Sequence, residues 1–302
     1  MKNTVILHAG APKTGTTSLQ FLLRDHDAEL RQQQVINLPR WVRSRNIHPV
    51  HTAFLRLRRE ELRTKAIEEG QAALGCEFER HPGYKMLISN ESVFGEPFYD
   101  GEKGFFPRAE AYMQAVAEML ASFEVQVCLT VRSTGTLVRS YYVQAVRKGY
   151  SGNFDDFYAS HVPDSPSWLP LVQRMKAIFP HVSIGDYETV QIEPDAALSA
   201  LFGGAVDLPW SAMQHSYSKN RSAGGNAVTL MRRANALLDR LYADESQQAR
   251  RQAQRRLRDR LFTMLEYIPG GEPVRAGHPL LVGLDAQYEA ERAAVLACDE
   301  AP

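Results

Sequence analysis

The sequence predicts an α/β fold in which helices flank a doubly wound parallel sheet. The chain opens with an apolar run, Thr4–Ala9, which a glycine-containing loop separates from an amphipathic segment, Thr16–Arg24. A buried strand, a turn and a helix in this order begin a βα unit of a parallel sheet. Further short apolar runs then alternate with helical periodicity, as they do in doubly wound sheets. The 302 residues are 44% hydrophobic and 23% charged, which suits a globular protein with a sizeable core.

The later elements follow the same alternation. Strands are predicted where short apolar runs end at polar residues, at Met86–Ser89, Val125–Val131 and Val182–Asp186. Helices are predicted where apolar residues recur on one face, at Arg108–Ser122, Thr136–Lys148, Ser165–Phe179 and Pro194–Phe202. We expect a single domain over residues 1–302, with a helical insertion at 39–84 and a C-terminal helical part at 226–302.

Composition and charge exclude several classes of protein. Lysine plus arginine equal aspartate plus glutamate at 35 each, so the net charge is zero, which argues against a non-specific nucleic-acid binder. The three cysteines are far apart and show no metal-site spacing, and free cysteines suit a reducing compartment. The N-terminal apolar run is too short for a signal peptide, and no run of about 18 apolar residues occurs. We therefore expect a cytoplasmic protein without a bound metal or a membrane span.

The loop after the first strand is the sharpest motif of the chain. It reads Gly-Ala-Pro-Lys-Thr-Gly-Thr-Thr and runs from Gly10 to Thr17. Glycines let the backbone turn tightly, and the N–H groups of such a turn, together with the N-terminus of the next helix, form an anion-binding site. The spacing is P-loop-like, with Gly10 and Gly15 as the two glycines, but Thr16 stands where a P-loop has lysine. The lysine, Lys13, lies inside the loop instead, which favours a ligand whose terminal group is close to the loop. The alternative is a glycine turn that only packs the helix on the strand.

A second candidate anion site follows the strand at 125–131. Arg132 comes directly after the strand, where ligands of α/β sheets bind, and Ser140 follows eight residues later in the next helix. An arginine fork with a hydroxyl group suits a dianionic phosphate. Arg132 and Ser140 in a capping or surface role are the alternative interpretation.

The two motifs together resemble those of the sulfotransferases that use 3′-phosphoadenosine 5′-phosphosulfate (PAPS), in their bacterial or carbohydrate-type branch. The segment Pro12–Thr17 is similar to the family's 5′-phosphosulfate loop. The resemblance implies that Lys13 bridges the 5′-phosphate and the leaving oxygen, and that the loop amides hold the 5′-phosphate, those of Thr14, Gly15, Thr16 and Thr17. It also implies that Arg132 and Ser140 bind the 3′-phosphate, although Ser133-Thr134 replaces the family's usual Asp-Pro.

Two further segments resemble nucleotide-binding parts of the same family. Tyr187, in Gly-Asp-Tyr-Glu, corresponds to a tyrosine beside the adenine, or else it is a buried core aromatic. The segment 216–225 resembles a loop that closes over the nucleotide with Lys219 and Arg221, or else it is a solvated loop before a helix.

Sulfuryl transfer needs a base, and Glu91 is the candidate. A carboxylate after a strand points into the ligand crevice, and a positioned base contributes about 10²–10⁴-fold in rate. Ser-Asn-Glu at 89–91 is similar to a Ser-x-Glu of the family, whose glutamate is the proposed base. Because other branches use histidine, the alternatives are His8, His48, His51 and His81, with His8 also interpretable as a structural residue.

The resemblance implies PAPS as donor, its desulfated form PAP as product, and no metal. The acceptor is a hydroxyl or an amine, with a carbohydrate or another small molecule as candidates. The Arg-rich stretch 40–63 is either a site for an anionic acceptor or a solvated helix face with acidic partners. Two other functions remain as alternatives. A P-loop kinase or NTPase would need lysine in place of Thr16, and a non-catalytic basic binding module would show strongly salt-dependent affinity.

Overall fold

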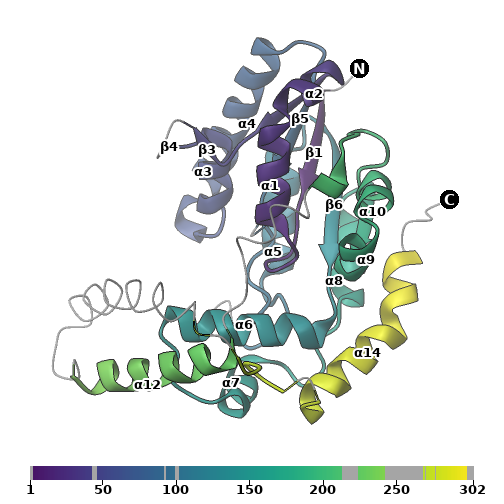
Figure 1. The fold of residues 1–302 in the computed structure, drawn as a ribbon. Helices are drawn as coiled ribbons and strands as arrows, with labels where there is room; N and C mark the ends of the chain where they lie inside the picture. The colour runs from purple at the N-terminus through teal and green to yellow at the C-terminus, as the bar shows by residue number, and fades with distance from the viewer. Residues whose placement is uncertain are drawn as a thin grey trace. The chain divides into compact units, whose positions relative to one another are not determined.

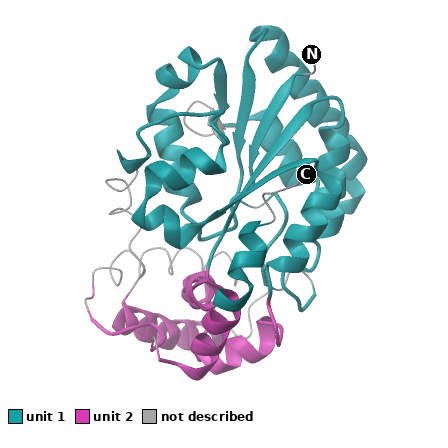
Figure 2. Ribbon diagram, turned by 90° about the vertical axis from the view of Figure 1, so that its right-hand side faces the viewer, with its two compact units in different colours: residues 1–132, 167–219, 289–302 teal, residues 133–166, 220–288 magenta. Residues whose placement is uncertain are grey.

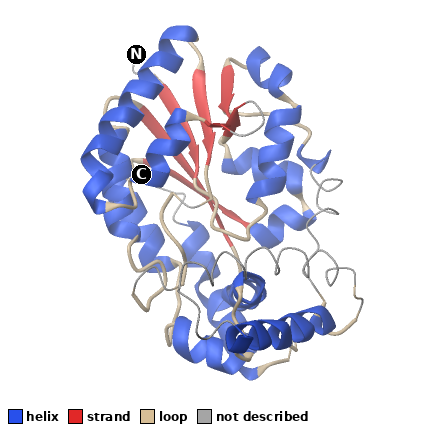
Figure 3. Cartoon of the chain, turned by 90° about the vertical axis from the view of Figure 1, so that its left-hand side faces the viewer, coloured by secondary structure: helices blue, strands red, loops and turns tan. Residues whose placement is uncertain are grey.

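The computed structural model describes residues 3–42, 46–91, 93–98, 102–212, 224–241, 268, 270–275 and 277–297. Its centre is a five-stranded, all-parallel sheet with the strand order β2-β5-β1-β6-β7 (Figure 1). The bounds of these strands are β1 Thr4–His8, β2 Val35–Leu38, β5 Lys85–Ser89, β6 Glu124–Val131 and β7 His181–Asp186. Figure 3 shows helices on both sides of the sheet.

The first strand lies in the middle of the sheet. β1 pairs with β5 on one side, with Val5 opposite Met86, and with β6 on the other, with Val5 opposite Val125. The side chains of residues 5–8 are buried, because a central parallel strand is covered on both faces. The loop that follows β1 therefore begins at the centre of the carboxyl edge, where α/β sheets bind ligands.

Helices α1 (Thr16–Asp25) and α10 (Pro194–Leu201) contribute to one buried cluster with the sheet. Leu19, Leu22 and Leu23 of α1 pack there with residues of β1, β5 and β6, among them Ile6 and Cys128. Their spacing of three and four residues places the leucines on one face of the helix. This packing holds the N-terminus of α1 directly after the loop.

Other helices complete the elements around the sheet. Their bounds are α2 Asp27–Gln32, α3 Pro49–Arg56, α4 Arg63–Arg80, α5 Ala109–Met119, α8 Leu169–Ile178 and α9 Tyr187–Ile192. Among the described residues, short 3-10 turns lie at Glu60–Leu62 and Trp210–Ala212. α4 packs on α3 and α5, and α5 packs on α8.

The chain divides into two compact units (Figure 2). Unit 1 contains the sheet and comprises residues 1–132, 167–219 and 289–302. Unit 2 comprises residues 133–166 and 220–288, and the secondary structure of its described residues is helical. It contains α6 (Thr134–Lys148), α7 (Phe154–His161), α12 (Gly225–Leu241) and the first part of α14 (Pro279–Leu296). In unit 2 the Asn235 side chain of α12 donates to the carbonyls of Val146 and Tyr150 at the end of α6.

The α/β class and the parallel sheet flanked by helices are confirmed, and several details are corrected. The helix expected from Ser165 begins at Leu169. The insertion expected to be helical at 39–84 contains α3 and α4 but also a two-stranded antiparallel hairpin, β3 (Trp41–Val42) with β4 (Asn46–Ile47). The edge strand β2 and the helices α2, α7 and α9 were not predicted. None of the helices in the described parts of the chain combines the length and the apolar run needed to cross a membrane.

Candidate functional site

The loop after β1 continues along β6 before it turns. The Ala9 N–H donates to the Cys128 carbonyl at 2.9 Å, and the Ala11 N–H donates to the Thr130 carbonyl at 3.5 Å. The turn then closes on Ala11, whose carbonyl accepts from the Thr14 N–H at 3.2 Å and from the Thr14 hydroxyl at 2.5 Å. The loop is thus a tight turn tied to the sheet at its start.

Two residues of the turn have left-handed backbone conformations. Lys13 has φ 72° and Gly15 has φ 80°. Glycine adopts this region freely, whereas a residue with a side chain does so at a cost of roughly 1–2 kcal/mol. The Lys13 conformation is therefore strained, and such strain concentrates at functional sites.

The N-terminus of α1 has the properties of an anion site. Gly15 is its N-cap and offers no side-chain oxygen to the first N–H groups, which have no partner within the helix. The Thr16 hydroxyl is buried and has no hydrogen-bond partner among the described residues. Gly10 lies against it, because a Cβ at Gly10 would be 2.5 Å from Thr16 Oγ1 and 2.7 Å from His8 Cε1. The loop thus leaves donors and positive dipole charge at one point.

A buried polar network supports the loop from below. His8 lies at the end of β1, with Nδ1 2.9 Å from Ser89 Oγ of β5 and Nε2 3.5 Å from Thr130 Oγ1 of β6. Burial lowers the pKa of His8 to about 4, so the ring is neutral at pH 7. Its two nitrogens thereby connect the ends of the three central strands.

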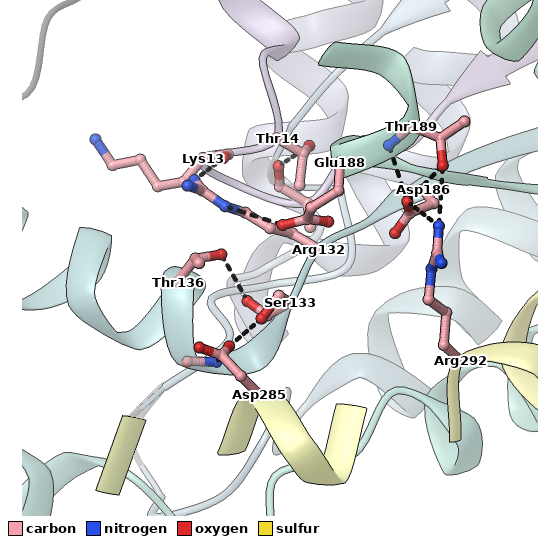
Figure 4. Close-up of polar contacts among 12 residues, drawn as sticks. Lys13, Thr14, Arg132, Ser133, Thr136, Asp186, Glu188, Thr189, Asp285 and Arg292 are labelled. Carbon is pink, nitrogen blue, oxygen red and sulfur yellow. Dashed lines mark hydrogen bonds and ion pairs between the residues drawn. The ribbon is translucent and has the colours of Figure 1, made fainter. Parts of the chain in front are cut away.

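Arg132 reaches the loop from the end of β6. Its Nη1 donates to the Lys13 carbonyl at 2.6 Å, and its Nε lies 4.0 Å from Glu188 Oε1 (Figure 4). The guanidinium carbon stands 4.7 Å from the centre of the Tyr187 ring, a cation–π contact. The Arg132 carbonyl accepts from Trp168 Nε1 at 2.8 Å. Contacts of both its guanidinium and its backbone carbonyl thus place Arg132 beside the loop.

Tyr187 and Glu188 begin α9, directly after β7. Asp186 caps this helix, because its Oδ2 accepts from the Thr189 N–H at 2.9 Å and from the Thr189 hydroxyl at 2.7 Å. Burial raises the pKa of Tyr187, and the positive charge of Arg132 opposes that shift. The phenol therefore stays protonated near neutral pH and offers its ring face to Arg132.

Glu91 follows β5 at the same edge of the sheet. The Asn90 N–H donates to the His8 carbonyl at 2.9 Å, so the chain before Glu91 is tied to the strand that leads into the loop. Gln20 of α1 donates to the Ser89 carbonyl at 3.0 Å, which adds a second connection. Glu91 itself is half-buried.

The alternative bases have structural contacts. His51 is buried and bonded to the Leu38 carbonyl at 2.9 Å, and burial lowers its pKa to about 4. His48 caps α3 by accepting from the Val50 N–H, and its Nε2 lies 3.6 Å from Glu77. The His81 N–H donates to the Glu77 carbonyl at the end of α4. Choosing Glu91 over the histidines stays a prediction.

The predicted nucleotide residues divide into three groups. Lys13, Thr14, Gly15, Thr16 and Thr17 lie together in the loop and the first turn of α1, and Arg132 and Tyr187 adjoin them through the contacts described above. Ser140 is a half-buried residue of α6 in unit 2. Lys219 and Arg221 lie outside the described residues.

Arginines of the stretch 40–63 pair with carboxylates of other segments. Arg56 pairs with Glu69 of α4, and Arg58 lies 3.7 Å from Glu96. The partners in these two pairs, Glu69 and Glu96, lie outside the stretch itself. The pairing favours the solvated-face interpretation over an acceptor site.

Sequence reasoning missed the residues that hold Arg132 and α9, namely Trp168, Asp186, Glu291 and Arg292. Asp186 directly before a helix was a recognisable N-cap, whereas nothing in the local sequence marks the other three. In the described parts of the chain, no group of three or more His, Cys, Asp or Glu residues is arranged to hold a metal. A scan against protein-family models gives no match for this chain, and a search among curated proteins also gives none, so the function rests on the chemistry of the site.

Proposed function

We propose that the chain is a sulfotransferase that moves a sulfuryl group from PAPS to an acceptor hydroxyl or amine. The observation that carries the proposal is the Lys13 loop, which leads into the buried, unpartnered Thr16 hydroxyl at the N-terminus of α1. Arg132 lies against this loop, so two groups that favour anions adjoin. The parallel sheet, with the loop at the end of its central strand, is compatible with a P-loop-like fold.

The residues present suit a donor with an anion at each end. The loop N–H groups, the Thr16 hydroxyl and the Lys13 ammonium would hold the 5′-phosphosulfate. Arg132 would bind the 3′-phosphate, and the aromatic ring of Tyr187 beside it would adjoin the adenine. Arginine suits the 3′-phosphate because its planar fork binds two phosphate oxygens at once. Ser140, on α6 of unit 2, stays a prediction as a 3′-phosphate ligand.

In the proposed reaction the acceptor atom forms a bond to sulfur while the bond between sulfur and the bridging oxygen breaks. Glu91 takes the proton of the acceptor as the acceptor atom attacks the sulfur. The electron pair of the broken bond stays on the 5′-phosphate, and Lys13 and the loop amides stabilise that charge. One such preorganised donor contributes about 3–4 kcal/mol to lowering the barrier.

A P-loop kinase or NTPase remains the second candidate. The glycine spacing and the helix N-terminus favour binding of phosphate groups in general, and adenosine triphosphate also carries phosphate groups on an adenosine. Against it, Thr16 occupies the position of the lysine that contacts β- and γ-phosphates, while Lys13 lies within the turn.

Calorimetry with PAP, PAPS and ATP side by side tests the proposal. We expect PAP and PAPS to bind and ATP with Mg²⁺ to bind at least tenfold more weakly, because the 3′-phosphate would be missing from Arg132. Lys13→Ala should weaken PAPS binding, whereas Lys65→Ala, an exposed α4 lysine, serves as the charge-matched control. Tighter binding of ATP than of PAP would favour the kinase alternative and refute the sulfotransferase.

A further inference from the structure

Two adjacent residues of unit 1, Glu291 and Arg292, lie near the end of α14. Each is hydrogen-bonded to a segment that in turn contacts Arg132. Arg292 Nη2 donates to Asp186 Oδ2 at 2.7 Å and lies 3.0 Å from Thr189 Oγ1 (Figure 4). Asp186 is only 4% exposed, and a buried carboxylate is costly unless it is paired. Arg292 therefore supplies the charge that lets Asp186 cap α9.

Glu291 holds the other segment. Its Oε1 accepts from the Trp168 N–H at 3.1 Å, and its Oε2 accepts from the Ser167 hydroxyl. The Trp168 side chain is fully buried, with its ring centre 4.9 Å from that of Phe105 and edge-on to it. The indole orientation is thus fixed on both sides, by packing and by the backbone that Glu291 anchors.

Both connections end at the same residue, Arg132. Trp168 Nε1 donates to the Arg132 carbonyl, which fixes the backbone of Arg132. The helix that Asp186 caps carries Tyr187 and Glu188, which flank the Arg132 guanidinium. One turn of the last helix therefore controls both the backbone and the side-chain surroundings of Arg132.

We propose that Glu291 and Arg292 are positioning residues that hold Arg132 in the orientation in which it binds the 3′-phosphate of the donor. The proposal rests on the proposed function, since it gives Arg132 that ligand. Neither residue contacts the reacting atoms. Loss of either one should loosen the Arg132 end of the site and leave the Lys13 end intact.

The expected effect is specific for the 3′-phosphate. Arg292→Ala and Glu291→Gln should weaken PAP binding on the order of tenfold, because a misplaced positioning group costs up to about 100-fold. Binding of adenosine 5′-monophosphate (AMP), which lacks the 3′-phosphate, should weaken much less than that of PAP. In turnover assays the KM for PAPS should rise while kcat stays near the wild-type value, as expected for lost ground-state binding.

Calorimetry of the full chain with PAP and AMP carries the test. The matched controls are Glu289→Gln, an exposed glutamate two residues before Glu291, and Arg174→Ala, which breaks an exposed pair with Glu110. Arg292→Lys keeps the charge but replaces the planar guanidinium, whose Nη2 reaches both Asp186 and Thr189, with an ammonium group, so partial rescue is expected. This variant carries the test if Arg292→Ala does not fold.

The outcomes separate the two proposals. Loss of the preference for PAP over AMP in both variants, with retained thermal melting, supports the positioning role. Wild-type PAP binding in the variants, or an equal loss of PAP and AMP binding, overturns it. If the wild-type chain and all variants alike fail to bind PAP, the sulfotransferase proposal is refuted and the positioning role with it.

Discussion

Replacing Gly10 with alanine tests whether the loop requires a residue without a Cβ at this position. The added Cβ would lie 2.5 Å from Thr16 Oγ1 and 2.7 Å from His8 Cε1, closer than carbon and oxygen atoms pack. The Thr16 hydroxyl can turn about its side-chain bond, but the His8 ring is held at both nitrogens, by Ser89 and Thr130. The strain should therefore fall on the histidine network and on the first turn of α1.

The size of the effect follows from the overlap. Forcing one carbon into a packed site costs about 1–3 kcal/mol. Gly75, inside α4, offers the matched control, because a Cβ there meets no atom within 4 Å. Alanine at Gly75 should stabilise the chain by about 0.5–1 kcal/mol, since glycine is unfavourable within helices. The two variants should thus differ by about 1.5–4 kcal/mol.

Urea unfolding of the two variants and the wild type measures this difference directly. PAP binding to folded Gly10→Ala should also be weaker, because the Thr16 hydroxyl is displaced. A Gly10→Ala protein as stable as Gly75→Ala would show that the loop has room at this position, and the close approach argued above would be wrong.

Three other predictions concern chemistry, pH and capping. Lys13→Ala and Glu91→Gln should each lower sulfuryl transfer at least 100-fold with unchanged melting; full turnover in either variant, measured with radiolabelled PAPS, excludes that residue. Because burial lowers the pKa of His8 from 6.5 to about 4, the unfolded chain binds more protons between these values. The stability that His8 contributes is complete above about pH 6.5 and falls by up to about 1.4 kcal/mol per pH unit toward pH 4. His8→Gln should remove that part of the slope in urea unfolding, and an unchanged slope would contradict the burial argument. Asp285→Ala should cost about 0.5–2 kcal/mol of unfolding free energy, because Asp285 accepts from the Ser133 hydroxyl and the Gly135 N–H at the start of α6; a fully stable variant would show that this cap is dispensable.

Local sequence patterns predicted the helices and strands that are determined by residues close in the sequence. β1 and α1 were predicted to within one residue at their ends, because an apolar run stops at Gly10 and leucines recur after Thr16. The start of α8 was placed four residues too early. Ser167 and Trp168 are held outside the helix by Glu291, more than 120 residues away in the sequence, and no local pattern contains that contact. β2 was missed for a similar reason, because its four residues are a strand only through pairing with β5.

In the candidate site, too, the residues could be predicted from local sequence, whereas their contacts depend on the tertiary structure. The loop residues and Arg132 could be chosen from sequence, because carboxyl ends of parallel strands meet at one edge. The direct contact of Arg132 with the Lys13 carbonyl depends on the strand order, which places β6 beside β1. Sequence periodicity does not report strand order or long-range contacts, so the contact of Trp168 with Arg132 became visible only in the structure.

The central place of β1 has a consequence for how the protein is made. The strand is synthesised first, yet β6 begins only at Glu124, and the loop N–H groups of Ala9 and Ala11 need the carbonyls of Cys128 and Thr130. At translation rates of about 5–20 residues per second, the first strand waits roughly 6–25 s for this neighbour. A nascent chain that has not yet reached about residue 130 therefore lacks the strand to which its own loop is bonded.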